Sequence, residues 1–318
     1  MDASSINDPS HGMSSNSKEA RVEVIVVPFF PMQSHLNQLL QLSCLISSSY
    51  NIPIHYATTA THLRQAKLRF DSQTHLQNPN IHFHEIPIPP IPSPPPNHNS
   101  SSRFPSHLLP SFDATLQLRH PVAELLREIS KTATRVVVIH DYLMAYVVQD
   151  VATIPNAESY IFNPISAFSM VLNDKSFQSL EQLKGTSSIQ EDTLPEEVEN
   201  FCALQVDFHS ITAGTIFNSS RSIEGVPILV WPRQGDQPRN AFLVTDILKA
   251  GLAITPWKIG QIVTSATICE VIKRLMASRE GEEIRRKAEE IGVAARQAVE
   301  GGGVSRLELD AFITHITR

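Results

Sequence analysis

Cysteine is scarce in this sequence, and no stretch is hydrophobic enough to cross a membrane. The three cysteines, Cys44, Cys202 and Cys269, form no CxxC pair, which favours a reducing compartment over a disulfide framework. The longest apolar stretch near the start, 22–31, is far shorter than the roughly 20 residues of a membrane-spanning helix. Residues 1–20 are polar and lack the apolar centre of a signal peptide. We therefore expect a cytoplasmic protein with no membrane partner and a disordered tail over residues 1–20.

Basic charge, phosphate-binding loops and nucleophile motifs are also missing. The net charge is −6 and lysine and arginine form no stripe, which argues against a nucleic-acid partner. The sequence contains no GxGxxG or GxxxxGK[ST] loop, and the absence of GxSxG disfavours a hydrolase. The histidines show no metal-ligand spacing, so we expect neither a metal nor a cofactor. With 42% hydrophobic and 18% charged residues, the 318-residue chain suits two globular domains.

Strands and helices alternate along the first two thirds of the chain. Residues 22–27 are nearly all apolar and β-branched, as in a buried parallel strand, and apolar residues at helical spacing follow over 36–46. Further strands are predicted at 52–57, 81–86, 135–139, 159–162 and 214–217, helices at 61–69, 112–131 and 143–151, and loops at 87–102 and 185–200. The alternation is typical of βαβ units and predicts an α/β fold with a Rossmann-type parallel sheet.

The last third of the chain has a different pattern. It offers one clear strand at 226–230 and a short second one at 252–254, with helices predicted at 242–249, 265–278, 282–300 and 305–316. A complete doubly wound half would need several parallel strands. We therefore predict a Rossmann-like domain over 21–225, followed by a truncated, mostly helical domain over 226–318.

Two polar residues follow buried strands, at the edge of an open parallel sheet where ligands bind. His35 lies just past the first strand, and a neutral imidazole there can accept a proton from a hydroxyl. Asp141 comes directly after strand 135–139, and its carboxylate can orient the imidazole and stabilise the imidazolium. The structural alternatives are an ordinary histidine at a helix start and an aspartate that caps a helix. His140 should point to the other side of the strand and is interpreted as structural.

The segments around both residues resemble a known family. VPFFPMQSHLNQLL (27–40) and VVVIHDYLMA (136–145) resemble motifs of the plant family 1 glycosyltransferases, which are GT-B enzymes that use UDP-sugars. IPIHYATTATH (52–62), FPSHLLPSF (104–112) and PNAESYIF (155–162) resemble its zeatin O-glucosyltransferase group. The resemblance implies that His35 is the catalytic base and Asp141 its partner. Ser34 replaces the glycine usual in the family, and we expect its Cβ to crowd the turn that presents His35.

The last third resembles the same family. GVPILVWPRQGDQPRNA (225–241) is similar to the end of its sugar-nucleotide signature, in which Asp236 and Gln237 match residues that hold sugar hydroxyls. A carboxylate and an amide suit that task as acceptor and donor. In the first domain, Asn163 and Phe168 belong to a segment that either lines the acceptor pocket or simply connects two elements.

The opening of that signature is absent. The Trp-Ala-Pro-Gln segment that stacks on the uracil and the His-Cys-Gly-Trp-Asn-Ser run that meets the diphosphate have no counterpart. Instead GTIFNSSRSIEG (214–225), which resembles a motif near the end of the acceptor-binding half, runs directly into the tail of the signature. We infer an internal deletion joined near Gly225. Donor binding should suffer, because each charge-assisted hydrogen bond to phosphate contributes about 1.5–3 kcal/mol.

The resemblance therefore implies a GT-B-like protein whose second Rossmann-like domain is truncated. Its implied reaction is the inverting transfer of glucose, or another hexose or a pentose, from a UDP-sugar to a hydroxyl of a small acceptor such as the cytokinin zeatin. The UDP-sugar is a co-substrate rather than a cofactor. The alternatives are a catalytically dead protein from a spliced or decayed gene that binds the acceptor as a decoy, and a polypeptide that is degraded because its core surface is exposed.

Overall fold

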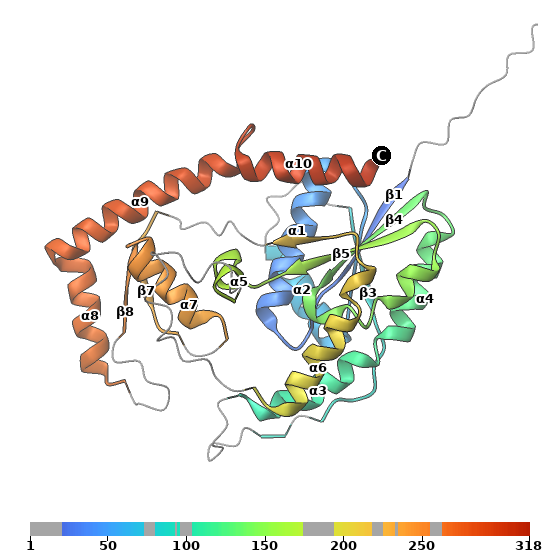
Figure 1. Cartoon of the computed structure of the whole chain (residues 1–318), viewed down its shortest axis with the longest axis horizontal. Helices are drawn as coiled ribbons and strands as arrows, with labels where there is room; N and C mark the ends of the chain where they lie inside the picture. Colours follow the sequence, from blue (N-terminus) through green and yellow to red (C-terminus); the bar gives the residue numbers. More distant parts are fainter. Residues whose placement is uncertain are drawn as a thin grey trace, which may run out of the picture.

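The computed structural model describes residues 21–72, 80–92, 94–95, 104–173, 194–217, 225–232, 235–254 and 263–318. The predicted tail over 1–20 lies outside these residues. So do residues 93 and 96–103 of the first predicted loop and residues 185–193 of the second. Figure 1 shows a body built around a large sheet, with smaller elements beside it and two long helices that connect the two parts.

A six-stranded parallel sheet lies at the centre of the larger body, in the order β3-β2-β1-β4-β5-β6. The strands are β1 (Val22–Val27), β2 (Ile54–Thr58), β3 (Ile81–Glu85), β4 (Arg135–Asp141), β5 (Ala157–Asn163) and β6 (Gly214–Phe217). β1 and β4 are neighbours, with Val26 opposite Ile139 and Val27 opposite His140. The chain winds outward in both directions from this pair, so their carboxyl ends form the switch point at which doubly wound sheets bind ligands. The predicted Rossmann-type sheet is confirmed.

Helices cover both faces of this sheet. On one face, α1 (Gln33–Tyr50) and α2 (Ala60–Ser72) pack against a core that includes Val24, Val26 and Ile139. On the other face, α3 (Leu109–Leu116), α4 (Arg119–Ser130) and α6 (Glu196–Asp207) pack against a core that includes Ile25 and Val138. Alternate residues of each strand therefore serve opposite cores, which explains why the strand sequences are almost wholly apolar.

Three predicted segments differ from the structure. The predicted helix 112–131 is two helices, because the chain tightens at Gln117 and Leu118, whose N–H groups bond three residues back. The predicted helix 143–151 consists of two short 3₁₀ segments, Tyr142–Met144 and Gln149–Thr153, because the Asp141 side chain binds the Leu143 N–H and Leu143 leaves helical geometry. Part of the second predicted loop is helical, because α6 begins at Glu196 with three glutamates in its first turn.

The last part of the chain contains a small β-sheet and several helices. Strands β7 (Ile228–Val230) and β8 (Gly251–Ala253) form a separate two-stranded parallel sheet. Between them α7 (Gln237–Phe242) continues into a π-helical turn, so the helix predicted at 242–249 begins earlier than expected. Three helices follow, α8 (Ser265–Ala277), α9 (Arg279–Val299) and α10 (Val304–Thr317). The mostly helical remnant is thus confirmed, while the boundary between 225 and 226 stays a prediction.

The last helix returns to the large sheet. Figure 1 shows α9 and α10 running from the small sheet back to the first helices, where the C-terminus lies. Ile313 and Ile316 of α10 are buried in the same core as β1 and α1. The Arg135 guanidinium, at the start of β4, donates to the His315 carbonyl oxygen at 3.0 Å. α10 is therefore an integral part of the larger body.

Candidate active site

His35 lies in the first turn of α1, where the chain leaves β1. Its backbone N–H donates to the Met32 carbonyl at 3.0 Å, and its ring centroid lies 5.8 Å from that of the buried Phe29. The side chain keeps 18% of its surface exposed, so one part of the imidazole is accessible. The crowding predicted for Ser34 is wrong, because this residue lies inside α1 with an exposed side chain and needs no left-handed backbone.

Asp141 is the last residue of β4, next to the carboxyl end of β1, and its side chain is fully buried. One carboxylate oxygen, Oδ2, lies 2.9 Å from His35 Nδ1. The other, Oδ1, accepts the Leu143 N–H at 2.9 Å. Asp141 therefore caps the following 3₁₀ turn and also pairs with the histidine, while its catalytic role stays a prediction.

The contact with Asp141 fixes the tautomer of His35. A carboxylate only accepts hydrogen bonds, so the imidazole must carry its proton on Nδ1. Nε2 then keeps a lone pair that can accept a proton. The pair reproduces two members of a Ser-His-Asp relay, with a substrate hydroxyl able to take the place of serine.

Opposing effects set the pKa of His35. Burial, the largest effect, lowers it, whereas the charge of Asp141, the hydrogen bond to it and the charge of Asp236 together raise the pKa above its ordinary value of 6.5. Because the pKa is higher in the folded state, the charged pair adds stability below pH 6.5 and loses this contribution as the pH rises through the folded value. The imidazole is a stronger base than an isolated histidine.

Asp141→Asn should lower the pKa of His35, because burial then acts without the carboxylate that opposes it. We expect the midpoint of the His35 ring titration, followed by NMR, to move to lower pH, and the acidic limb of the pH–rate profile to move with it. Asp150→Asn is the matched control, since Asp150 pairs with Arg119 instead and should leave the midpoint in place. An unchanged midpoint in Asp141→Asn would contradict the ion pair.

Asp236, from the other part of the chain, lies near enough to His35 for its charge to act on the imidazole. Its charge contributes to the raised pKa of His35, and its Oδ2 accepts a hydrogen bond from Asn240 Nδ2 at 2.8 Å. Gln237 follows as the exposed first residue of α7. The structure thus brings a predicted sugar-binding carboxylate toward the His35–Asp141 pair, and the sugar-binding role of both residues stays a prediction.

Near Asp236, α5 (Ala167–Asn173) of the larger body contacts α7, which lies between the two strands of the small sheet in sequence. Ser166 Oγ donates to Asn240 Oδ1 at 2.5 Å, and the Arg239 guanidinium donates to the Ser169 carbonyl at 3.3 Å. Sequence reasoning missed these residues, because no local pattern marks a bond between segments 70 or more positions apart.

The two predicted acceptor-pocket residues lie on the same side of the fold as this contact. Asn163 ends β5 and is buried; its Oδ1 accepts the Ile165 N–H at 3.0 Å and its Nδ2 lies 3.5 Å from Met170 Sδ. Phe168 is half-buried in the first turn of α5. The local bonds of Asn163 agree with the connecting-segment alternative, and contact of either residue with an acceptor stays a prediction.

The described residues contain no group of three histidine, cysteine, aspartate or glutamate side chains that could hold a metal ion. In the same part of the chain, every helix is too short or too polar to span a membrane.

Comparisons with known proteins place this site in a family. The glycosyltransferase N-terminal domain family matches residues 20–243. The zeatin O-glucosyltransferase of Phaseolus lunatus is 29% identical, with 94% of this chain and 98% of the relative covered. The zeatin O-xylosyltransferase of Phaseolus vulgaris is also 29% identical, covering 94% of this chain and 99% of the relative. A solved structure of a Glycyrrhiza uralensis glycosyltransferase, in complex with glycyrrhetinic acid 3-O-monoglucuronide, superposes with a TM-score of 0.67 at 14% identity, covering 92% of this chain and 95% of the other.

The alignments also show how this chain differs from its relatives. The alignment to the Phaseolus lunatus protein runs over 464 positions, whereas this chain has 318 residues, so at least 146 positions have no residue here. Because the alignment covers 98% of that relative, the missing positions lie inside it. The chain therefore belongs to the plant family 1 UDP-glycosyltransferases of the GT-B fold, and it lacks residues that its relatives have in the interior of their sequences.

Proposed function

We propose that this protein transfers a sugar, glucose or another hexose or a pentose, from a UDP-sugar to a hydroxyl of a small acceptor such as zeatin. The observation that carries the proposal is the 2.9 Å contact between His35 Nδ1 and Asp141 Oδ2, at the switch point of the large sheet. That contact leaves Nε2 as a base beside the place where an acceptor would bind. The names of the relatives, which include a zeatin O-glucosyltransferase and a zeatin O-xylosyltransferase, support the choice of acceptor.

In this proposal the acceptor hydroxyl lies against Nε2 of His35. Its oxygen attacks the anomeric carbon while its proton passes to Nε2, and the bond from that carbon to the UDP oxygen breaks. Attack from the side opposite to UDP inverts the configuration. Asp141 stabilises the imidazolium that forms, and Asp236 and Gln237 hold hydroxyls of the sugar. General-base assistance of this kind is worth about 10²–10⁴ in rate.

A second candidate function is acceptor binding without transfer. It is favoured by the small sheet, which has only β7 and β8 in the described part of the chain, and by the missing aligned positions. A protein with this remnant would keep the acceptor-binding domain and would bind the UDP-sugar weakly. It would then act as a decoy for the small molecule.

An assay with both substrates separates the two candidates. The purified chain is incubated with trans-zeatin and UDP-glucose at up to millimolar concentration, and glucoside is measured by liquid chromatography and mass spectrometry. Zeatin binding is measured in parallel by calorimetry. We expect binding together with slow glucoside formation that grows with donor concentration. Zeatin binding with no product at any donor concentration would support the decoy, and no zeatin binding would contradict both.

A further inference from the structure

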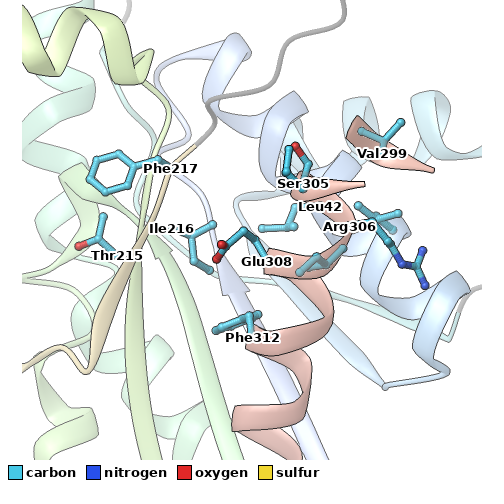
Figure 2. A pocket seen from close by; sticks show the side chains of 12 residues that line it. Leu42, Thr215, Ile216, Phe217, Val299, Ser305, Arg306, Glu308 and Phe312 are labelled. Carbon is cyan, nitrogen blue, oxygen red and sulfur yellow. The ribbon is translucent and has the colours of Figure 1, made fainter. Parts of the chain in front are cut away.

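A groove of about 630 Å³ lies beside β6, away from the His35–Asp141 pair. Its walls come from α1, from β6, and from the end of α9 and the start of α10. Figure 2 shows Ile216 pointing from β6 toward Glu308 and Phe312 of α10, whereas Thr215 and Phe217 lie on the other side of the strand. The groove therefore extends along the outer edge of the large sheet.

Large apolar side chains are exposed around this groove. Four of its lining residues keep much of their surface accessible: Leu45 43%, Phe217 47%, Val299 56% and Val304 70%. Arg306 and Glu308 also line it, so it carries one charge of each sign. Exposed apolar patches bounded by polar residues commonly mark interaction sites.

The strand beside the groove, β6, ends the strand order, and within the described residues its outer edge pairs with no other strand. The Ala213 N–H donates to the Ser159 carbonyl of β5 at 2.8 Å. Because main-chain groups alternate in direction along a strand, those of Thr215 and Phe217 face β5, and those of Gly214 and Ile216 face outward. Unpaired edge groups of this kind are templates for another strand.

We propose that β6 and this groove bind a second copy of the chain, with the two β6 strands antiparallel about a two-fold axis at Thr215. Gly214 of one copy then lies opposite Ile216 of the other, and these outward-facing residues can exchange four main-chain hydrogen bonds. The edge is self-complementary, because its two outward-facing residues are placed symmetrically about Thr215.

The side chains agree with this two-fold arrangement. Rotation about an axis perpendicular to the sheet keeps both α10 helices on the same side of the joined sheet. The exposed Val299 and Val304 of one copy can then pack against those of the other. Arg306, which pairs with Asp310 in its own copy, and Glu308 have opposite charges, so a contact between Arg306 of one copy and Glu308 of the other would be favourable. The inference is independent of the proposed transfer reaction.

Sedimentation velocity of the purified chain tests this interface. We expect a concentration-dependent species with twice the 35.3 kDa mass of one chain. Ile216→Pro removes an outward N–H but no bond to β5, and Val304→Glu places a charge in the groove. Each should raise the dimer dissociation constant about tenfold or more. Leu307→Glu is the matched control, because Leu307 is 55% exposed on the same helix but does not line the groove.

Cysteine cross-linking tests the register separately. In a Cys269→Ser background, Thr215→Cys should form an intermolecular disulfide under mild oxidation, because residues opposite each other at the axis have Cα atoms about 4.5 Å apart. Phe217→Cys should not, since its symmetry mate lies several residues away. A chain that stays monomeric at all concentrations would overturn the proposal. So would a dimer that is insensitive to both groove variants, or one cross-linked at 217 and not at 215.

Discussion

Replacing His35 with alanine is expected to slow sugar transfer by about 10²–10⁴-fold at saturating UDP-glucose, with zeatin affinity changed by no more than about threefold. The imidazole accepts the acceptor proton only as the new bond forms, so its loss affects the transition state more than the bound substrate. Initial rates of glucoside formation and calorimetric zeatin binding measure the two effects.

Two variants sharpen the interpretation of this result. His120→Ala removes an exposed histidine of α4 and should leave the rate unchanged. His35→Gln fills the space without supplying a base near neutral pH and should be as slow as the alanine variant. A His35→Ala enzyme with full activity would assign the proton transfer to another group. Loss of zeatin binding together with activity would make His35 a structural residue of the acceptor site.

UDP-glucose is expected to bind this chain at least about a thousandfold more weakly than it binds the full-length zeatin O-glucosyltransferase of Phaseolus lunatus. The family resemblance implies that the segment that meets the diphosphate is absent. The loss of three charge-assisted hydrogen bonds at about 1.5–3 kcal/mol each would exceed the roughly 4 kcal/mol that three decades require. A two-stranded remnant also offers little support for a nucleotide.

Parallel calorimetric titrations of the two proteins with UDP-glucose and with UDP measure this difference. The two ligands should be weakened together, because they share the nucleotide and differ by the sugar that Asp236 and Gln237 are proposed to hold. Zeatin titrated into both proteins is the control and should show similar affinities. Donor affinity equal to that of the relative would mean that another part of this chain binds the diphosphate.

The sequence was most informative where apolar runs are long and uninterrupted. β1 and β4 were predicted within two residues, because a strand buried on both faces must be apolar throughout. The meeting of His35 and Asp141, 106 residues apart, could be suspected only because both follow parallel strands whose carboxyl ends share one edge. The resemblance to a family singled out these two positions before the distance between them was known.

Other features depend on tertiary contacts that local patterns do not encode. The division of the predicted helix 112–131 at Gln117, and the 3₁₀ turns after Asp141, follow from side-chain and packing demands within otherwise apolar segments. Two hydrogen bonds, from Ser166 to Asn240 and from Arg239 to Ser169, join distant parts of the chain. The packing of α10 against the large sheet likewise could not be predicted from its amphipathic pattern, because the pattern indicates that one side of the helix is buried but not which element covers it.

The position of α10 has a consequence for how the protein unfolds. Its buried Ile313 and Ile316 complete a core built mainly from residues before 165, so the first and last segments share one set of apolar contacts. Thermal or chemical denaturation should therefore disrupt both in a single cooperative step, even though the small β7–β8 sheet lies between them in sequence. A fragment that stops at residue 225 would lose the part of the cover that α10 gives to one face of its sheet and would be prone to aggregate.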